Sequence, residues 1–197
     1  MKFIIATNNK KKLRELAVIL EKLGVSAVSL AEAGVESDVE ETGTTFEENS
    51  RLKAVAAMEK SGLPAIADDS GLEVDALGGE PGVFSARYGG DLCADDVERY
   101  KYLLKNMENV PDGKRSARFV SVITCVFPDG REISARGEIE GEILREARGE
   151  GGFGYDPVFF VPGENMTTAE MSQERKNEIS HRAKSLQLMS KKLEEVL

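Results

Sequence analysis

The sequence predicts an α/β fold in which helices flank a mixed central sheet. Its N-terminal part alternates strand-like and helical patterns, because the apolar run at residues 2–6 is followed by apolar residues at helical spacing and then by a second strand-like run at residues 25–30. Further along, strand-like runs at residues 116–127 and 131–144 flank the turn-forming sequence Pro128–Asp129–Gly130. Alternating strands and helices favour parallel pairing and a hairpin is antiparallel, so strands of both directions are expected.

The N-terminal elements have recognisable ends. Gly24 follows a helical pattern over residues 13–23 and is expected to end that helix. In Thr44–Thr45–Phe46–Glu47–Glu48 a threonine precedes a glutamate by three residues, as in a capping box, so a second helix is expected over residues 45–60. A short strand at residues 65–67 should then present Asp68–Asp69–Ser70–Gly71 at its carboxyl end.

The middle and C-terminal parts combine irregular and regular segments. Residues 78–90 and 149–162 are rich in glycine and are expected to be irregular, whereas residues 95–107 and the tail from residue 180 have helical patterns. No linker or shift in composition separates these parts. We therefore expect a single domain, residues 1–197, in which two lobes share one sheet.

The composition excludes several classes of protein. With 197 residues, 41% of them hydrophobic, the chain can bury a core without disulfides, and Cys93 and Cys125 lie in dissimilar contexts. A net charge of −9 opposes binding to a phosphate backbone, so no polymeric nucleic acid is expected as a partner. The sequence has no apolar run of about 18 residues and no secretory signal, which predicts no membrane association and a cytoplasmic location.

The loop between the first strand and the first helix is a candidate anion site. Backbone N–H groups at a helix start attract anions, and lysines there add mobile positive charge, so a phosphate is a suitable ligand. The alternative is a solvated, lysine-rich first turn without a ligand. The loop consists of Thr7, Asn8, Asn9, Lys10, Lys11 and Lys12.

Paired carboxylates indicate metal or acid–base chemistry. Asp68 and Asp69 follow an apolar strand, and ligands bind at the carboxyl ends of strands in open α/β sheets. Two carboxylates can hold Mg²⁺, or one can take a proton from attacking water; the alternative is a capping aspartate and a turn. Glu40 and Glu41, before the second helix, could supply a further ligand or form only a solvated charged run.

Two further segments contain residues suited to binding. Residues 149–157 combine glycines with Phe153 and Tyr155, whose rings are expected to be exposed and able to stack on a base, although such loops also occur in proteins that bind no ligand. Later in the chain, Lys176, Arg182 and His181, the only histidine, are candidate hydrogen-bond donors. A single histidine is more often structural than catalytic, and no Gly-x-Ser-x-Gly motif supports a serine nucleophile.

Together these segments resemble the inosine triphosphate pyrophosphatase family, whose members hydrolyse non-canonical purine nucleoside triphosphates. The resemblance covers essentially the whole chain. The family often has glycine at the position of Asn8, in a loop that can require a positive φ, and asparagine is the next most tolerant residue there. The most specific strings are ADDSGL at residues 67–72, LGGEPG at 77–82, GGFGYDP at 151–157 and SHR at 180–182.

The resemblance implies both the chemistry and the residues. It implies a homodimeric hydrolase that uses Mg²⁺ to convert inosine, deoxyinosine and xanthosine triphosphates (ITP, dITP and XTP) to the monophosphate and pyrophosphate. Glu40 and Asp69 would bind the metal, and Asp69 would also be the catalytic base. The substrate site would be lined by Thr7, Asn8, Asn9, Lys10, Lys11, Lys12, Lys53, Ser70, Arg87, Phe153, Gly154, Tyr155, Asp156, Lys176, His181 and Arg182.

The expected reaction is attack of water on the α-phosphate, with the active site in the cleft between the two lobes. Arg182 is a candidate donor to the 6-oxygen of the purine, which distinguishes it from an amino group. Two alternatives stay open: a pyrophosphatase for modified or pyrimidine triphosphates on a related fold, and a sensor that binds nucleotide without turnover. The sequence does not explain how GTP is excluded, nor whether Asp68 or Glu41 also binds the metal.

Overall fold

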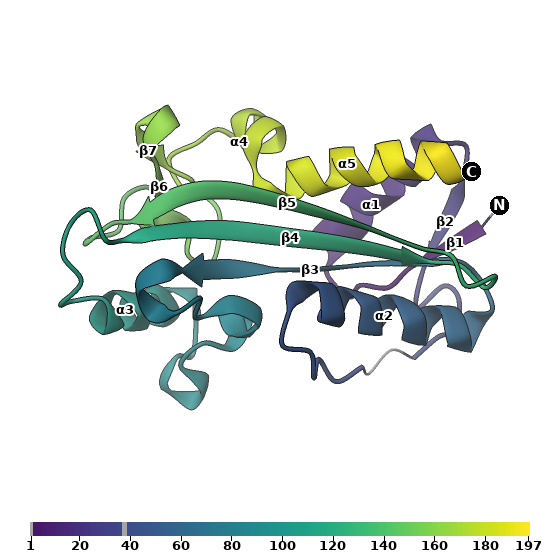
Figure 1. The fold of residues 1–197 in the computed structure, drawn as a ribbon, viewed down its shortest axis with the longest axis horizontal. Helices are drawn as coiled ribbons and strands as arrows, with labels where there is room; N and C mark the ends of the chain where they lie inside the picture. Colours follow the sequence, from purple (N-terminus) through teal and green to yellow (C-terminus); the bar gives the residue numbers. More distant parts are fainter. Residues whose placement is uncertain (1, 37–38) are drawn as a thin grey trace. The chain divides into compact units, whose positions relative to one another are not determined.

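The computed structural model describes residues 2–36 and 39–197 and contains a seven-stranded sheet (Figure 1). The strands lie in the order β2-β1-β3-β4-β5-β6-β7. Their bounds are β1 (Lys2–Ile5), β2 (Ser26–Ser29), β3 (Ala65–Val74), β4 (Ser116–Val126), β5 (Glu132–Ile143), β6 (Phe159–Val161) and β7 (Met166–Thr167). Strand β1 pairs in parallel with β2 and β3, and β6 pairs antiparallel with β5 and β7, so the prediction of a mixed sheet is confirmed.

The helices have the caps that the sequence encodes. Asn9 accepts hydrogen bonds from the first-turn N–H groups of α1, and Thr45 and Glu48 form the predicted reciprocal capping box of α2. The α-helices are α1 (Lys10–Lys22), α2 (Phe46–Ser61), α3 (Asp96–Asn106), α4 (Gln173–Ile179) and α5 (His181–Val196). Within the described residues, no helix combines the length and the apolar composition that crossing a membrane requires.

The chain divides into two compact units. Unit 1 contains Met1–Asp69, Ser121–Gly137 and Arg182–Leu197, and unit 2 contains Ser70–Val120 and Glu138–His181. Strands β3, β4 and β5 contribute residues to both units. Each unit has an apolar core of its own.

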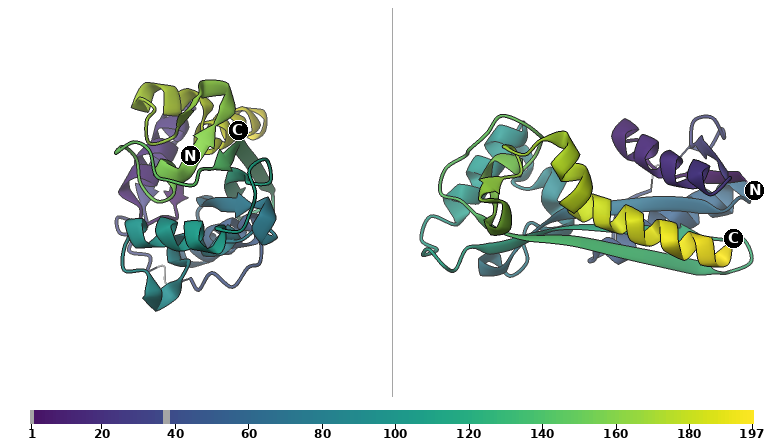
Figure 2. Two further views of the ribbon diagram at one scale, coloured as in Figure 1. Left: turned by 90° about the vertical axis from the view of Figure 1, so that its left-hand side faces the viewer. Right: turned by 90° about the horizontal axis from the view of Figure 1, so that it is seen from above.

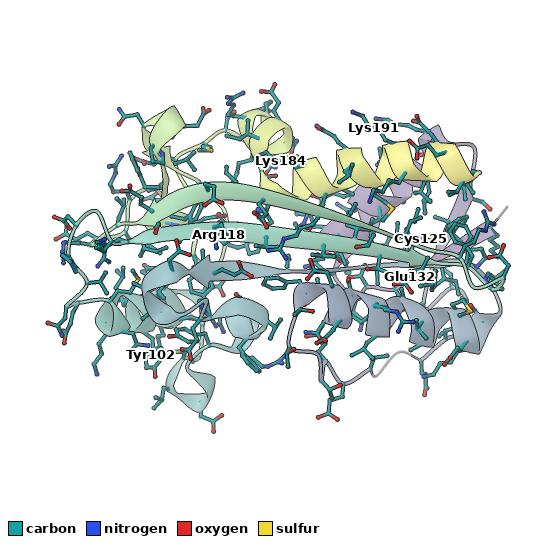
Figure 3. All side chains as sticks on the ribbon, viewed as in Figure 1. Tyr102, Arg118, Cys125, Glu132, Lys184 and Lys191 are labelled. Carbon is teal, nitrogen blue, oxygen red and sulfur yellow. The ribbon has the colours of Figure 1, made fainter. Side chains whose placement is uncertain are left out.

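The core of unit 1 lies on both faces of its strands, because successive strand residues point to opposite faces. Phe3 and Ile5 of β1 pack with apolar residues of α1 and α5. Ile4 and Ala6 of the same segment pack with apolar residues of α2. Helices α1 and α5 therefore cover one face of these strands and α2 covers the other, and Figure 2 shows α5, in yellow, running along the strands. Cys125 of β4, labelled in Figure 3, is buried in the first of these clusters, and its burial raises the pKa of the thiol to about 12.

The core of unit 2 packs α3 against the neighbouring strands. Leu103 of α3 is fully buried in a cluster with Leu72 of β3 and Phe159 of β6. On polar positions of the strands, Arg118 of β4, also labelled in Figure 3, lies 3.1 Å from carboxylate oxygens of Asp75 and of Glu140. Apolar positions thus build the core of this unit while the intervening charged positions pair with one another.

Strand β3 corrects one prediction about element boundaries. It was expected to end at Ala67, but it continues to Val74, so Asp68 and Asp69 lie within the strand rather than at its carboxyl end. Two adjacent aspartates interrupt an apolar pattern, which is why the sequence indicates an end there. The strand tolerates them because each carboxylate pairs with a lysine from a helix of unit 1.

Candidate active site

Asp68 and Asp69 point to opposite faces of β3, as the strand period of two requires. Asp68 meets Lys12 of α1, whose Nζ lies 2.6 Å from Asp68 Oδ2. Asp69 meets Lys53 of α2, whose Nζ lies 3.2 Å from Asp69 Oδ1. Helices α1 and α2, on opposite faces of unit 1, therefore each supply one lysine to one aspartate.

The two aspartates have pKa values shifted in opposite directions. Burial tends to raise the pKa of Asp68, but the positive charges of Lys12 and Arg182 outweigh it, so this pKa is below its usual range. Burial also raises the pKa of Asp69, and the nearby Glu41 carboxylate raises it further, while Lys53 only partly opposes them. The net pKa of Asp69 is above its usual range, which makes this carboxylate the better proton acceptor of the two.

Glu41 rather than Glu40 is the glutamate next to this group. Glu41 Oε1 lies 2.8 Å from Lys53 Nζ, so Lys53 bridges Glu41 and Asp69. Burial lowers the pKa of Lys53, but these carboxylates and Asp68 outweigh the effect and raise it. Glu40 is exposed, and its carbonyl accepts the N–H of Thr42 at 3.0 Å. The metal-binding role predicted for Glu40 stays a prediction, and Glu41 is the residue of the pair that the fold brings to Asp69.

The loop before α1 forms a capped helix start, and its role as an anion site stays a prediction. Asn9 Oδ1 accepts hydrogen bonds from the N–H groups of Lys11 and Lys12 at 3.0 and 3.2 Å, and Asn9 N donates to Thr7 Oγ1 at 3.2 Å. The first turn contains no acidic residue, although lysines at a helix N-terminus are unfavourable unless an anion offsets them. Asn8 has no positive φ, since Asn165 alone has one among the described non-glycine residues, so this loop does not need glycine.

Arg182 lies at the start of α5 and faces α1 of unit 1. Its Nε is 3.5 Å from Glu15 Oε2, and the guanidinium side chain is only 13% exposed. Both residues line a small pocket that also includes Lys12, Asp68 and Ser121. The structure therefore brings two predicted site residues, Lys12 and Arg182, together with Asp68 in one pocket of unit 1.

A second group of predicted residues lies in unit 2 around Asp156. Asp156 Oδ2 accepts hydrogen bonds from Lys176 Nζ at 2.8 Å and from Phe153 N at 3.0 Å. Its Oδ1 accepts one from Thr168 Oγ1 at 2.7 Å. Asp156 is buried, and Phe153 is 60% exposed, so the glycine-rich loop presents an aromatic ring next to a carboxylate that is bonded on both oxygens.

The expectation that the Tyr155 ring is exposed is wrong. Tyr155 is only 4% exposed and belongs to the core of unit 2. Its hydroxyl donates a 2.7 Å hydrogen bond to the carbonyl of Ser85, and burial raises the pKa of the phenol. The ring is long enough to fill the core while its polar end reaches a backbone acceptor, a use of tyrosine that sequence alone does not distinguish from base stacking.

The remaining predicted residues of unit 2 are dispersed. His181 stacks on Phe119 with ring centroids 5.1 Å apart, which is a packing contact. Arg87 is exposed, and its guanidinium carbon lies 5.1 Å from the centroid of the exposed Phe84 ring. Ser70 is half-buried on β3, and Gly154 N donates to Asp96 Oδ2 at 2.8 Å.

Asp69 keeps an oxygen available to a hard divalent cation. Its Oδ2 is buried and accepts no hydrogen bond from the described residues, whereas Asp68 points to the opposite face of β3. Residues 2–36 and 39–197 contain no group of three or more His, Cys, Asp or Glu arranged to hold a metal. Mg²⁺ commonly takes one or two carboxylates and completes its shell with water and phosphate oxygens, so a protein cage of three ligands is not needed.

Comparison with known proteins decides the family. The model of the Ham1 family matches residues 3–192. The chain belongs to the Ham1 family. A dITP/XTP pyrophosphatase of Desulforamulus reducens is 52% identical over 186 residues, covering 94% of this chain and 92% of the relative. A dITP/XTP pyrophosphatase of Thermus thermophilus is 51% identical over 189 residues, covering 96% and 90%. The solved structure of the Staphylococcus aureus Ham1 protein matches with a TM-score of 0.93, at 42% identity and 100% coverage of both chains.

Membership of the Ham1 family confirms the resemblance to the inosine triphosphate pyrophosphatases and the α/β fold. Sequence reasoning did not single out two residues that contact the predicted site. Glu15 follows Lys12 by three residues on α1, and this helical spacing is a signal that could have indicated it. Thr168 has no such signal, because its contact with Asp156 depends on how the chain folds back within unit 2.

Proposed function

We propose that this member of the Ham1 family hydrolyses dITP, ITP and XTP to the nucleoside monophosphate and pyrophosphate, with Mg²⁺. The family and the names of its relatives confirm the prediction of a nucleoside triphosphate pyrophosphatase that acts on non-canonical purines. The observation that supports the chemistry is the arrangement in unit 1, where two buried aspartates each pair with a lysine and Asp69 Oδ2 accepts no hydrogen bond from the described residues. Buried, incompletely bonded carboxylates are costly, and a bound cation offsets that cost.

We assign Asp69 to metal binding together with a glutamate of the preceding loop. Glu40 was predicted for this role, and Glu41 is the better placed of the two because it shares Lys53 with Asp69. When bound, Mg²⁺ withdraws negative charge from the phosphate oxygens. The pKa of Asp68 is lowered by Lys12 and Arg182. Asp68 therefore stays charged next to these two side chains rather than taking a proton.

Asp69 is the base in the proposed reaction. Its Oδ2 accepts no hydrogen bond from the described residues and its raised pKa favours proton uptake, so it takes a proton from a water molecule. The oxygen of that water forms the new bond to the α-phosphorus. The bond from the α-phosphorus to the bridging oxygen breaks, and pyrophosphate leaves with the electron pair.

Positive charge from the chain stabilises the phosphates. The loop from Thr7 to Lys12, with Lys53, supplies ammonium groups to the triphosphate in this proposal, while Asn9 caps the N–H groups of Lys11 and Lys12. These groups are in place before the reaction, so little reorganisation is needed as charge moves to the leaving group.

The nucleoside is assigned to the remaining predicted residues. Phe153 offers an exposed ring for stacking on the base, and Asp156 with Lys176 offers a buried polar pair. Arg182 is assigned to the 6-oxygen of the purine. The substrate site keeps five further assigned residues: Ser70, Arg87, Gly154, Tyr155 and His181.

Four other expectations stay predictions. They are the cleft between two lobes, the homodimer, the cytoplasmic location, and the absence of nucleic acid and membrane partners.

A substrate panel tests this function. Release of pyrophosphate and orthophosphate would be measured from ITP, dITP, XTP, ATP, GTP and TTP, with Mg²⁺ and with a chelator. Pyrophosphate from the first three alone, abolished by the chelator, is the expected result. Preferred turnover of TTP would favour a pyrimidine or modified-nucleotide pyrophosphatase, and binding without any product would indicate a sensor.

A further inference from the structure

The Asp156 carboxylate is held on both oxygens within unit 2. Lys176 and Phe153 donate to Oδ2, and the hydroxyl of Thr168 donates to Oδ1 at 2.7 Å. Asp156 is 7% exposed and Thr168 is 5% exposed, so water competes little for these bonds. We propose that Thr168 is a positioning residue of the nucleotide site, whose hydroxyl fixes the orientation in which Asp156 and Lys176 meet the substrate.

The backbone of Thr168 is itself fixed, which makes its hydroxyl a rigid donor. Thr168 N donates to the carbonyl of Phe159 at 3.0 Å, and the next residue, Ala169, donates its N–H to the carbonyl of Asp156 at 3.2 Å. Thr168 Oγ1 also lies 3.2 Å from that same carbonyl oxygen. The segment that carries Thr168 is therefore bonded to the segment that carries Asp156 through main chain and side chain together.

Gly152 confines the carboxylate from the other side. A Cβ atom at Gly152 would lie 2.0 Å from Asp156 Oδ2 and 2.7 Å from Lys176 Nζ, so the loop backbone is packed directly on the pair. A carboxylate has about four acceptor positions, of which three are occupied here, and the fourth is on Oδ1. Without the Thr168 hydroxyl, Oδ1 loses its donor and the direction of that remaining acceptor position is no longer fixed.

This inference rests on the proposed function, in which Asp156 binds the nucleoside and does no chemistry. A weaker hold on Asp156 should reduce binding of substrate and transition state alike, which raises KM and leaves kcat nearly unchanged. A hydrogen bond to a charged group is large enough for an effect of about tenfold. The increase in KM should depend on whether the side chain has a hydroxyl and not on its volume.

The test compares Thr168→Val with Thr168→Ser and with a matched control on the neighbouring residue. Valine keeps the shape of threonine without the hydroxyl, and serine restores the hydroxyl. Thr167 is also buried, and its hydroxyl donates to the carbonyl of Arg148 at 2.8 Å without contacting Asp156, so Thr167→Val removes a partly buried hydroxyl bond of a neighbouring threonine. Steady-state kcat and KM for dITP and the melting temperature would be measured for each variant, with Thr168→Ala replacing valine if that variant does not fold.

The expected result is a KM about tenfold higher in Thr168→Val, with kcat within about twofold, and a KM close to that of the parent chain in Thr168→Ser and Thr167→Val. An unchanged KM in a folded Thr168→Val variant would overturn the inference, and so would equal increases in the two valine variants. If the parent chain itself does not hydrolyse dITP or XTP, the proposed function fails. In that case the affinity of the same variants for inosine monophosphate, measured by calorimetry, tests the positioning role of Thr168 independently of turnover.

A double-mutant cycle tests whether Thr168 acts through Asp156. Asp156→Ala should raise KM by itself, and Thr168→Val should then add nothing, because the carboxylate that the hydroxyl positions is gone. Additive increases in KM would show that Thr168 acts on binding by another route, and the assignment as a positioning residue for Asp156 would be dropped.

Discussion

Asp68 and Asp69 are adjacent on β3 and yet are expected to affect stability with opposite signs. The lowered pKa of Asp68 means that its charge stabilises the folded state above the unfolded pKa, and this contribution is lost as the pH falls through the folded pKa. The raised pKa of Asp69 means that its charge costs stability above the folded pKa. That cost is absent below the unfolded pKa, where both states hold the proton.

Replacing each aspartate by asparagine should therefore shift the melting temperature in opposite directions. In metal-free protein at pH 7, Asp68→Asn should lower it and Asp69→Asn should raise it, each by a few degrees, since about 1 kcal/mol corresponds to roughly 2–4 °C in a chain of this size. The difference for Asp69 should disappear below about pH 3.5. Scanning calorimetry as a function of pH measures both, and shifts of the same sign would contradict the assigned pKa directions.

Turnover separates the base from its neighbour. Asp69→Asn should reduce kcat by about 10³-fold or more, because an amide cannot take the proton from water, even though the variant is more stable. The gain in stability rules out unfolding as the reason for lost activity. Near-normal hydrolysis of dITP by this variant would remove Asp69 from the role of base.

Selectivity for a 6-oxygen should depend on Arg182. We expect Arg182→Ala to lower kcat/KM for dITP by about 10- to 100-fold while the slow hydrolysis of ATP changes little, because adenine has no acceptor at that position. Arg175→Ala is a suitable control, since Arg175 is exposed and pairs with Glu164 and Glu178 instead. Equal losses for both nucleotides would show that Arg182 contributes binding without discrimination.

At the scale of elements, Arg115 joins the end of α3 to the end of β5. Its guanidinium donates to carbonyl oxygens of Met107, Val110, Ile143 and Leu144, at 2.7 to 3.2 Å, and the residue is only 5% exposed. Methionine at this position would fill the volume and remove all four bonds of the guanidinium, although Met107 and Val110 each keep another donor. We expect Arg115→Met to lower the free energy of unfolding by about 3 kcal/mol, measured by urea denaturation.

The control for Arg115 is a neighbouring arginine on the surface. Arg145 is half-exposed and pairs with Asp112, which is 83% exposed, and it shares one acceptor with Arg115 because its Nη2 also donates to the carbonyl of Val110 at 3.1 Å. Because surface ion pairs contribute about 0–1 kcal/mol, Arg145→Met should change stability by less than about 1 kcal/mol. A similar loss in both variants would mean that Arg115 stabilises the fold no more than a surface charge does.

The elements that the sequence predicts correctly are those with local signals. Helices α1 and α2 and the β4–β5 hairpin follow from periodicity, caps and turn residues within each segment. The length of β3 could not be predicted, because Asp68 and Asp69 become acceptable in a strand only through lysines from other elements. Residues 149–162 were expected to be irregular, but β6 lies within them; β6 and β7 are short and owe their pairing to tertiary contacts.

At the scale of the whole molecule, the family can be predicted from sequence motifs spread over the chain. The contacts within each site cannot be predicted from those motifs. The carboxylates and lysines were recognisable as residue types, and unit 1 brings Lys12, Lys53, Asp68 and Asp69 together. The choice between Glu40 and Glu41 depends on how their loop meets α2, and it has no sequence signal. Tyr155 shows the same limit, because burial is a property of the folded unit and not of the motif.

Ligand binding should stabilise the whole chain only when metal and phosphate are present together. Mg²⁺ and pyrophosphate at about 100 times their dissociation constant add about 2.7 kcal/mol, which corresponds to a rise of roughly 5–10 °C in the melting temperature. Either ligand alone should give less, because the carboxylates need a cation and the loop from Thr7 to Lys12 needs an anion. Asp69→Asn should lose most of the joint effect, whereas an equal rise in that variant would place the metal on other residues.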